Sequence, residues 1–332
     1  MSRRPALLTI LLLPVLFHAC TPPEPPISAA EALTFAKKVE RSITQQNPTL
    51  LDNIFDAGWF GRQVTAASGN TLKASTVSEA VKDIRKAHFG QRILSIVGKD
   101  GTYLLLRQYE KDHRQHLLFR LYGDAGINYH DFELVKVDDQ IKAIDVYIYQ
   151  TGENFSKTIA DLLILVDADR PNTTKEDKEK SRLTNRLRKL IGKKEFEAAR
   201  VCYDSLPVSY KHQKAYQLYH IQIGSQLGDS LHSKSLLEYQ ALFPNDPSLY
   251  LLMINAYILQ KQYPLALTAI DKLDSTLGKD PFQDYYRGLV YNRMKDSARA
   301  LACFERVHAY LPSFGQANLE LQSYPSLKKK MP

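Results

Sequence analysis

Apolar residues recur at helical spacing in the first part of the chain and at alternating positions further on. A capping box of Ser28 and Glu31 opens a helix that Asn47 and Pro48 end, and helical stretches at 50–56 and 78–88 follow. Strand-like runs are expected at 92–98, 102–110, 115–122, 126–137 and 140–149, with hairpin turns at 99–102 and 137–140, and a last helix at 156–165. This order predicts an α+β domain over residues 28–166, with helices on one face of a curved antiparallel sheet.

The second half of the chain repeats its pattern of large and small residues at an interval of 34 positions. Aligning the segment that starts at Pro247 with the one that starts at Pro281 superposes aromatic and alanine positions. A weaker copy starts at Gln213, and a further copy precedes it. We expect four pairs of antiparallel helices, followed by a short capping helix at about 315–322, within residues 180–323. The charged, proline-containing stretch 167–179 is expected to be a linker.

This repeat resembles the tetratricopeptide repeat. Gly288, Tyr291, Ala300, Phe304 and Pro312 match the small residue, Tyr, Ala, aromatic residue and Pro of that family. The resemblance implies a solenoid in which the first helix of each pair lines a concave groove. The matching groove positions are Lys214, Gln217, Ile221, Leu251, Asn255, Ile258, Leu259, Phe282, Tyr285, Leu289, Asn292 and Arg293. Such a mixed surface suits an extended peptide or a partner helix, unless the N-terminal domain or the capping segment of the chain fills the groove itself.

The order of elements in the first half is similar to the nuclear transport factor 2-like (cystatin-like) cone, a fold shared by enzymes and binding domains. Candidates for a general base in such a cone are His88, His116, Tyr129, Asp131 and Asp145. Asp145 shares one strand face with two tyrosines, so it lies either inside a cone among tyrosines or in water.

A metal site formed by the two closely spaced histidines in this half is not expected. His113 and His116 are three positions apart, and on a strand their side chains would point to opposite faces. We therefore predict no metal ion.

The N-terminus has the pattern of an export signal. Arg3 and Arg4 precede an apolar run at 6–17 that is too short to span a bilayer. The sequence up to Cys20 resembles the bacterial lipobox, which implies lipidation of Cys20. The alternative is an ordinary signal peptide that leaves Cys20 as a free thiol. The expected divisions are a signal peptide at 1–19, a lipid anchor and Pro-rich spacer at 20–27, and a basic tail at 324–332.

Charge and cysteine content narrow the function classes. The net charge is +8, but the lysines and arginines of the second half are interspersed with acids, so we expect no nucleic-acid partner. Cys202 and Cys303 fall at the same position of two distant repeats, too far apart for a disulfide. No phosphate-binding glycine loop, nucleophile elbow or CxxC pair occurs, and no cofactor is expected.

These features together resemble lipoproteins with tetratricopeptide repeats from Bacteroidetes-type bacteria. The sequence therefore predicts an exported, lipid-anchored, non-enzymatic adaptor at the cell membrane or outer membrane, facing the periplasm and binding another envelope protein or a peptide. One alternative is an enzyme or small-ligand-binding protein that uses the N-terminal cone. Another, by analogy, is an outer-membrane assembly factor.

Overall fold

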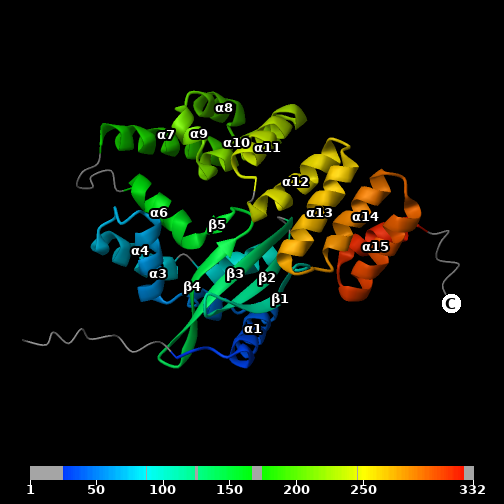
Figure 1. Cartoon of the computed structure of the whole chain (residues 1–332), viewed down its shortest axis with the longest axis horizontal. Coiled ribbons are helices and arrows are strands. Elements are labelled where there is room, and N and C mark those ends of the chain that lie inside the picture. Colours follow the sequence, from blue (N-terminus) through cyan, green and yellow to red (C-terminus); the bar gives the residue numbers. More distant parts are fainter. Residues whose placement is uncertain (1–24, 87, 124–125, 167–173, 245, 325–332) are drawn as a thin grey trace, which may run out of the picture.

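The computed structural model describes residues 25–324 except 87, 124–125, 167–173 and 245 (Figure 1). The predicted signal peptide, the lipidation site Cys20 and residues 325–332 of the predicted tail lie outside the described residues. Among the helices that the structure describes, none is long and apolar enough to cross a membrane.

The first part of the chain is helical up to residue 97. Helix α1 begins at the predicted capping box, where the Ser28 backbone N–H donates to the Glu31 carboxylate at 2.9 Å. Short helices then follow one another before the first strand. The bounds are α1 Ala29–Thr44, α2 Thr49–Asp52, α3 Ala57–Ala67, α4 Ala74–Lys86 and α5 Phe89–Val97.

A five-stranded antiparallel sheet follows, with its strands in sequence order. Its bounds are β1 Thr102–Lys111, β2 Arg114–Gly123, β3 Gly126–Val137, β4 Gln140–Ile148 and β5 Glu153–Asn154. Asp138 and Asp139 have φ angles of 48° and 59° between β3 and β4, as a two-residue hairpin turn requires. Four of the predicted strands are thus confirmed, and the final helix α6 (Phe155–Val166) is confirmed as well.

The prediction of a strand at 92–98, the first of the five in chain order, is wrong because this segment forms helix α5. Its buried residues Phe89, Ile93, Leu94 and Val97 recur at helical spacing, which outweighs the strand preference of the β-branched side chains. The carboxylate of Asp52, distant in sequence, accepts the backbone N–H of Gly90 at 2.7 Å at the start of this helix. The hairpin turn expected at 99–102 is therefore wrong too, since this stretch joins a helix to β1.

The rest of the described chain is helical, which confirms an α+β region followed by an all-α region. Helix α7 starts at Lys175, inside the stretch expected to be a linker. The capping helix has the predicted bounds. The helices are α7 Lys175–Gly192, α8 Phe196–Asp204, α9 Val208–Lys211, α10 Lys214–Leu227, α11 Asp229–Leu242, α12 Pro247–Leu259, α13 Tyr263–Leu277, α14 Gln283–Arg293, α15 Ser297–Tyr310 and α16 Gly315–Gln322.

These helices pack in pairs, most closely α10 with α11, α12 with α13, and α14 with α15 (Figure 1). We call α10, α12 and α14 the first helices and α11, α13 and α15 the second helices of these pairs. Cys202 on α8 and Cys303 on α15 are buried free thiols, as expected from their positions.

The close approach of α14 to α15 depends on Gly288. A Cβ atom added at Gly288 would lie 2.5 Å from the Phe304 ring, so Gly288→Ala is expected to cost about 1–3 kcal/mol through overpacking. At Gly192, on α7, an added Cβ meets nothing within 4 Å, and Gly192→Ala should be neutral or stabilising by up to ~1 kcal/mol. Urea unfolding compares the two variants, and equal effects would contradict the predicted packing.

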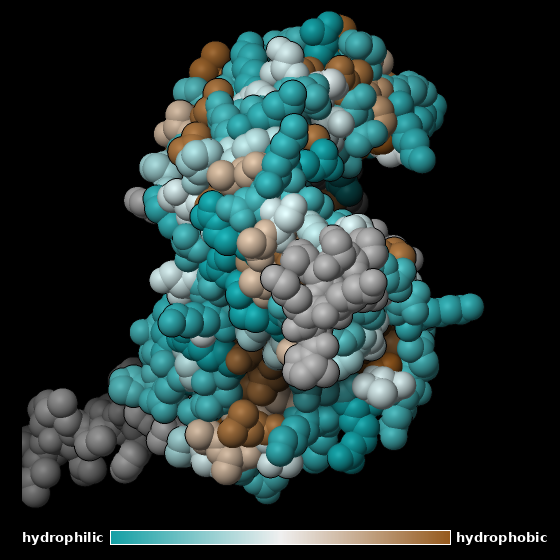
Figure 2. All heavy atoms as spheres, turned by 90° about the vertical axis from the view of Figure 1, so that its right-hand side faces the viewer, coloured by the Kyte–Doolittle hydropathy of each residue, from teal (hydrophilic) through white to brown (hydrophobic). Residues whose placement is uncertain are grey.

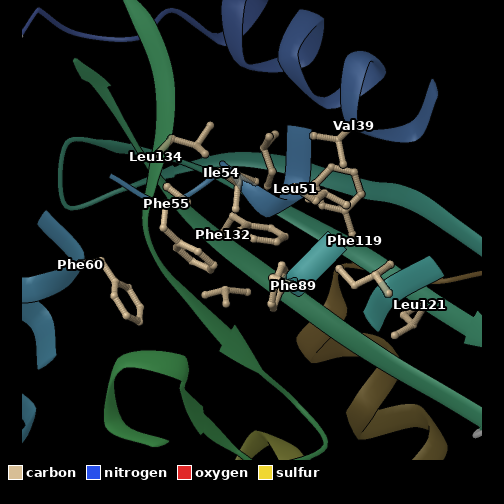
Figure 3. Packing of buried hydrophobic residues seen from close by; sticks show 14 of the residues in the cluster. Val39, Leu51, Ile54, Phe55, Phe60, Phe89, Phe119, Leu121, Phe132 and Leu134 are labelled. Atoms are coloured by element: carbon tan, nitrogen blue, oxygen red, sulfur yellow. The ribbon is translucent and has the colours of Figure 1, made fainter. Parts of the chain in front are cut away.

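Both faces of the sheet are covered. On β2, alternate residues Leu117, Phe119 and Leu121 face a core formed with α1, α2, α3, α5 and α6, where aromatic rings from several elements converge (Figure 3). The intervening residues Leu118 and Tyr122 face the helical region instead. The apolar run Leu117–Phe119 in β2 follows from this two-sided burial.

The outer surface is mainly hydrophilic on the side where α14 and α15 lie. Figure 2 shows hydrophobic side chains there as small patches within a hydrophilic surface. A patchwork of this kind is usual for protein surfaces and identifies no binding site by itself.

Candidate functional site

The second face of the sheet packs against the first helices α12 and α14 and their neighbours. Tyr129 on β3 and Tyr149, just after β4, share a buried cluster with Leu249 and Ile254 of α12. At the other end, the fully buried Phe282 ring lies 5.1 Å from the Tyr122 ring on β2. Large aromatic side chains contribute much of the free energy of such a contact. The sheet and the helical region therefore share one hydrophobic core.

A buried ion pair fixes this contact. Arg120 Nη1 on β2 lies 2.5 Å from Asp280 Oδ1, which precedes α14, and both side chains are 0% exposed. The Tyr129 hydroxyl donates to the other carboxylate oxygen of Asp280 at 2.9 Å. The guanidinium of Arg120 also lies 4.8 Å from the centre of the Phe282 ring. An ion pair without access to water requires such additional contacts, because both charges have lost their hydration.

A second polar contact lies around Asp246, just before α12. Lys214 Nζ on α10 pairs with the Asp246 carboxylate and donates to the backbone carbonyl of Gly152, which precedes β5. The hydroxyl of Tyr147 on β4 donates to Asp246 at 3.4 Å, and that of Tyr239 on α11 donates at 2.8 Å. The Asp246 carboxylate thus contacts side chains of β4, α10 and α11, and Lys214 links it to the loop before β5.

The sequence-predicted groove residues divide into two sets along the first helices. Those toward the helix N-termini are buried or half-buried, and several contact the sheet or the capping helix: Lys214, Gln217, Ile221, Leu251, Phe282 and Tyr285. Those toward the C-termini are half-buried or exposed: Leu289, Ile258, Asn255, Leu259, Asn292 and Arg293. The alternative that the N-terminal domain fills the groove therefore applies to the first set. The second set remains accessible.

Asp145 occupies neither of the environments expected from the sequence. It is 2% exposed and accepts the backbone N–H of Ser156 at 3.1 Å and that of Val146 at 2.8 Å, and its second oxygen accepts the Ser156 hydroxyl. Burial raises the pKa of Asp145 to about 6, against the lowering effect of these hydrogen bonds. The carboxyl group therefore anchors the start of α6 to the sheet.

Of the other candidate bases, only His116 and Asp131 lie together among the described residues. Tyr129 belongs to the buried ion-pair network described above, and His88 precedes α5 with its ring nitrogen 3.8 Å from Asp52. On the second sheet face, His116 Nδ1 lies 3.3 Å from Asp131, which also accepts the hydroxyl of Tyr109. The side chains of His116, Tyr109 and Asp131 therefore use one another as hydrogen-bond partners.

His113 lies in the turn between β1 and β2 with a φ angle of 61°, so the assumption that it belongs to a strand is wrong. Within the ranges that the structure covers, no three His, Cys, Asp or Glu side chains could share a metal ion.

Two residues that sequence reasoning missed are Arg120 and Asp280. A signal for Arg120 exists, because it is the only charged residue in the apolar run Leu117–Leu121. Asp280 precedes Pro281, which is typical of a helix start, and nothing in its local sequence indicates a partner 160 positions away.

Comparisons of the chain with protein-family models, with curated proteins and with solved structures found no significant match.

Proposed function

We propose that the chain is a membrane-tethered adaptor of the bacterial cell envelope that binds another envelope protein or a peptide through its helical region. The observation that carries the proposal is the accessible second set of groove residues. Leu259 is 55% exposed at the end of α12, and Asn255, Asn292 and Arg293 are exposed on α12 and α14. We call these four residues the open groove edge.

The open groove edge has the composition that peptide recognition needs. The Asn255 amide can pair with the backbone groups of an extended segment, Arg293 can bind a carboxylate, and Leu259 offers an apolar contact. The Asn292 amide donates to Glu320 of the capping helix α16 at 3.2 Å, and its oxygen can accept from a partner. The resemblance to the tetratricopeptide repeat supports the same surface, because these positions face a ligand in that family.

The sheet holds the other ends of the same helices in place, which favours binding at the open groove edge. A surface that is rigid before binding loses less conformational entropy when a partner docks. Phe282, at the start of α14, packs against Tyr122 of β2, and Asp246, at the start of α12, accepts the hydroxyl of Tyr147 on β4. The proposed role of the sheet domain is therefore to brace the binding surface.

The tether is proposed from the sequence at Cys20. A lipidated Cys20 would be joined to α1 by eight residues, four of them proline, which act as a semi-rigid spacer. The adaptor would then work close to the membrane surface, where its partner would also be located.

The test of this proposal compares two leucines of similar exposure. Leu259→Asp in the open groove edge should weaken partner recovery by about tenfold or more, whereas Leu237→Asp on the second helix α11 should leave it unchanged. The two side chains are 55% and 57% exposed, so neither change should unfold the chain. Partners are recovered by crosslinking and co-purification from native membranes and identified by mass spectrometry.

Arg293→Glu provides an independent variant at the same edge, with an expected loss of recovery similar to that of Leu259→Asp. Full recovery of the same partner with both edge variants would contradict the proposed surface. Loss with Leu237→Asp alone would place the binding surface on the second helices.

A further inference from the structure

A small crevice separates α6 of the sheet domain from helices α7 and α10. Its volume is about 210 Å³, and Leu162 and Ile164 of α6 and Ala215 of α10 form its apolar lining. Pockets for drug-sized ligands measure ~300–1,000 Å³. The occupant that fits is therefore a small molecule or the end of a chain, and not a folded element.

One wall of the crevice carries two carboxyl groups. Glu153, on β5, accepts the Thr158 hydroxyl at 2.7 Å and has no basic side chain paired with it among the described residues. Burial raises the pKa of Glu153, against the lowering effects of the Thr158 hydrogen bond and of the nearby charges of Lys157 and Lys214. Asp161, one helical turn into α6, pairs with Lys157 and is 37% exposed. This wall would favour a cationic group.

The opposite wall carries two basic groups on α7. Lys180 Nζ donates to the side-chain oxygen of Gln213 at 3.0 Å. Arg188 is exposed, and within the described part of the chain its guanidinium has neither a hydrogen bond nor an ion pair. A free guanidinium at a crevice mouth can bind a carboxylate through two parallel hydrogen bonds.

Two tyrosines of α10 lie between these walls. The Tyr216 hydroxyl is engaged at 2.5 Å with Thr184, whereas no described group bonds to the hydroxyl of Tyr219. Burial raises the pKa of Tyr219, while Arg188 lowers it and Glu153 and Asp161 raise it, which places the Tyr219 ring within electrostatic reach of both walls. An aromatic floor between an acidic and a basic wall suits a ligand with an apolar body and opposite charges at its ends.

We propose that this crevice binds a small zwitterion of the size of an amino acid or a dipeptide. The ammonium group of the ligand lies toward Glu153 and Asp161, its carboxylate toward Arg188, and its side chain against Tyr219. The site is separate from the open groove edge, so it does not depend on the proposed adaptor function. Because its walls come from the sheet domain and from α7 and α10, an occupied site would also join these two parts of the molecule.

The experiment measures ligand binding to the mature chain, residues 20–332 with Cys20→Ala. The probes are free amino acids and dipeptides with apolar side chains, each compared with its N-acetylated and its amidated form. At least one zwitterion should raise the Tm and bind in calorimetry, and blocking either end should weaken binding by about tenfold.

The variants are Glu153→Gln and Arg188→Gln, each expected to weaken binding of that zwitterion by about tenfold. Arg182→Gln on the same helix is the matched control, since Arg182 is exposed and paired with Glu179, and its Kd should stay within about twofold. Because Arg188 is exposed, its replacement leaves the fold intact, which the Tm without ligand verifies. The proposal is overturned if no zwitterion binds the unmodified chain, or if Arg188→Gln binds as tightly as Arg182→Gln.

Discussion

Replacing Asp280 by alanine is expected to lower the free energy of unfolding by about 3–5 kcal/mol. The variant leaves the guanidinium of Arg120 buried without its counter-charge, and it removes the acceptor of the Tyr129 hydroxyl. Both losses occur at the contact between the sheet and α14. Urea unfolding of the full chain measures the change, and a single cooperative transition permits its conversion to a free energy.

An exposed ion pair provides the control for this prediction. Arg299 and Asp296 lie 2.6 Å apart, with side chains 58% and 29% exposed, and Arg299→Ala should cost far less stability than Asp280→Ala because water screens this pair. The double change Arg120→Met with Asp280→Ala should recover much of the lost stability, since it leaves no unpaired buried charge. If Asp280→Ala costs no more than Arg299→Ala, the ion pair is not a structural element of the contact.

The second large expected effect is a pH dependence due to Asp145. Its pKa is raised from 3.8 to about 6 in the folded chain, so the folded state favours the protonated carboxyl. The contribution of this group to stability is fully present below about pH 4 and is lost as the pH rises through about 6. The expected loss is about 2–3 kcal/mol, because the carboxyl is almost completely buried.

The measurement compares the unmodified chain with Asp145→Asn in urea at pH 4, 5, 6 and 7.5. Asparagine keeps the shape of the side chain and can bond to Ser156, but it does not titrate. The difference in unfolding free energy between the two chains should therefore shift in favour of Asp145→Asn as the pH rises. His130 has a pKa lowered to about 4 by burial and acts in the opposite direction, but it is common to both chains and cancels. A pH-independent difference would contradict the inferred environment of Asp145.

Much of the fold could be predicted from the sequence because local signals agree with it. The capping box at Ser28, the two-residue turn at Asp138 and Asp139, and the repeat interval of 34 positions each report on structure that forms between near neighbours. The secondary structure of segment 92–98 was harder to predict, because the spacing of its apolar residues fits both a helix and a strand. The distant carboxylate of Asp52 at the start of α5 is a tertiary contact that no local pattern contains.

The candidate site was only partly predictable, because local patterns contain no information on contacts between distant parts of the chain. The repeat interval indicates which residues of α10, α12 and α14 share one side, and the exposed Asn255 and Arg293 are among them. It contains no information on what lies against that side. The pairing of Arg120 with Asp280 joins residues 160 positions apart. Phe282 is buried against Tyr122 of the sheet, and Tyr285 packs against Phe314 and bonds to Gln316 of the capping helix.

The most direct test of this account asks whether the sheet domain is held by the helical region when the chain between them is cut. A protease site inserted between Asp169 and Thr173 would allow the purified full chain to be cleaved into two fragments. Size-exclusion chromatography in native buffer then reports their association. We predict that the fragments elute together as a one-to-one complex, held by the shared core and by the Arg120–Asp280 pair. Two folded fragments that elute separately would contradict the account.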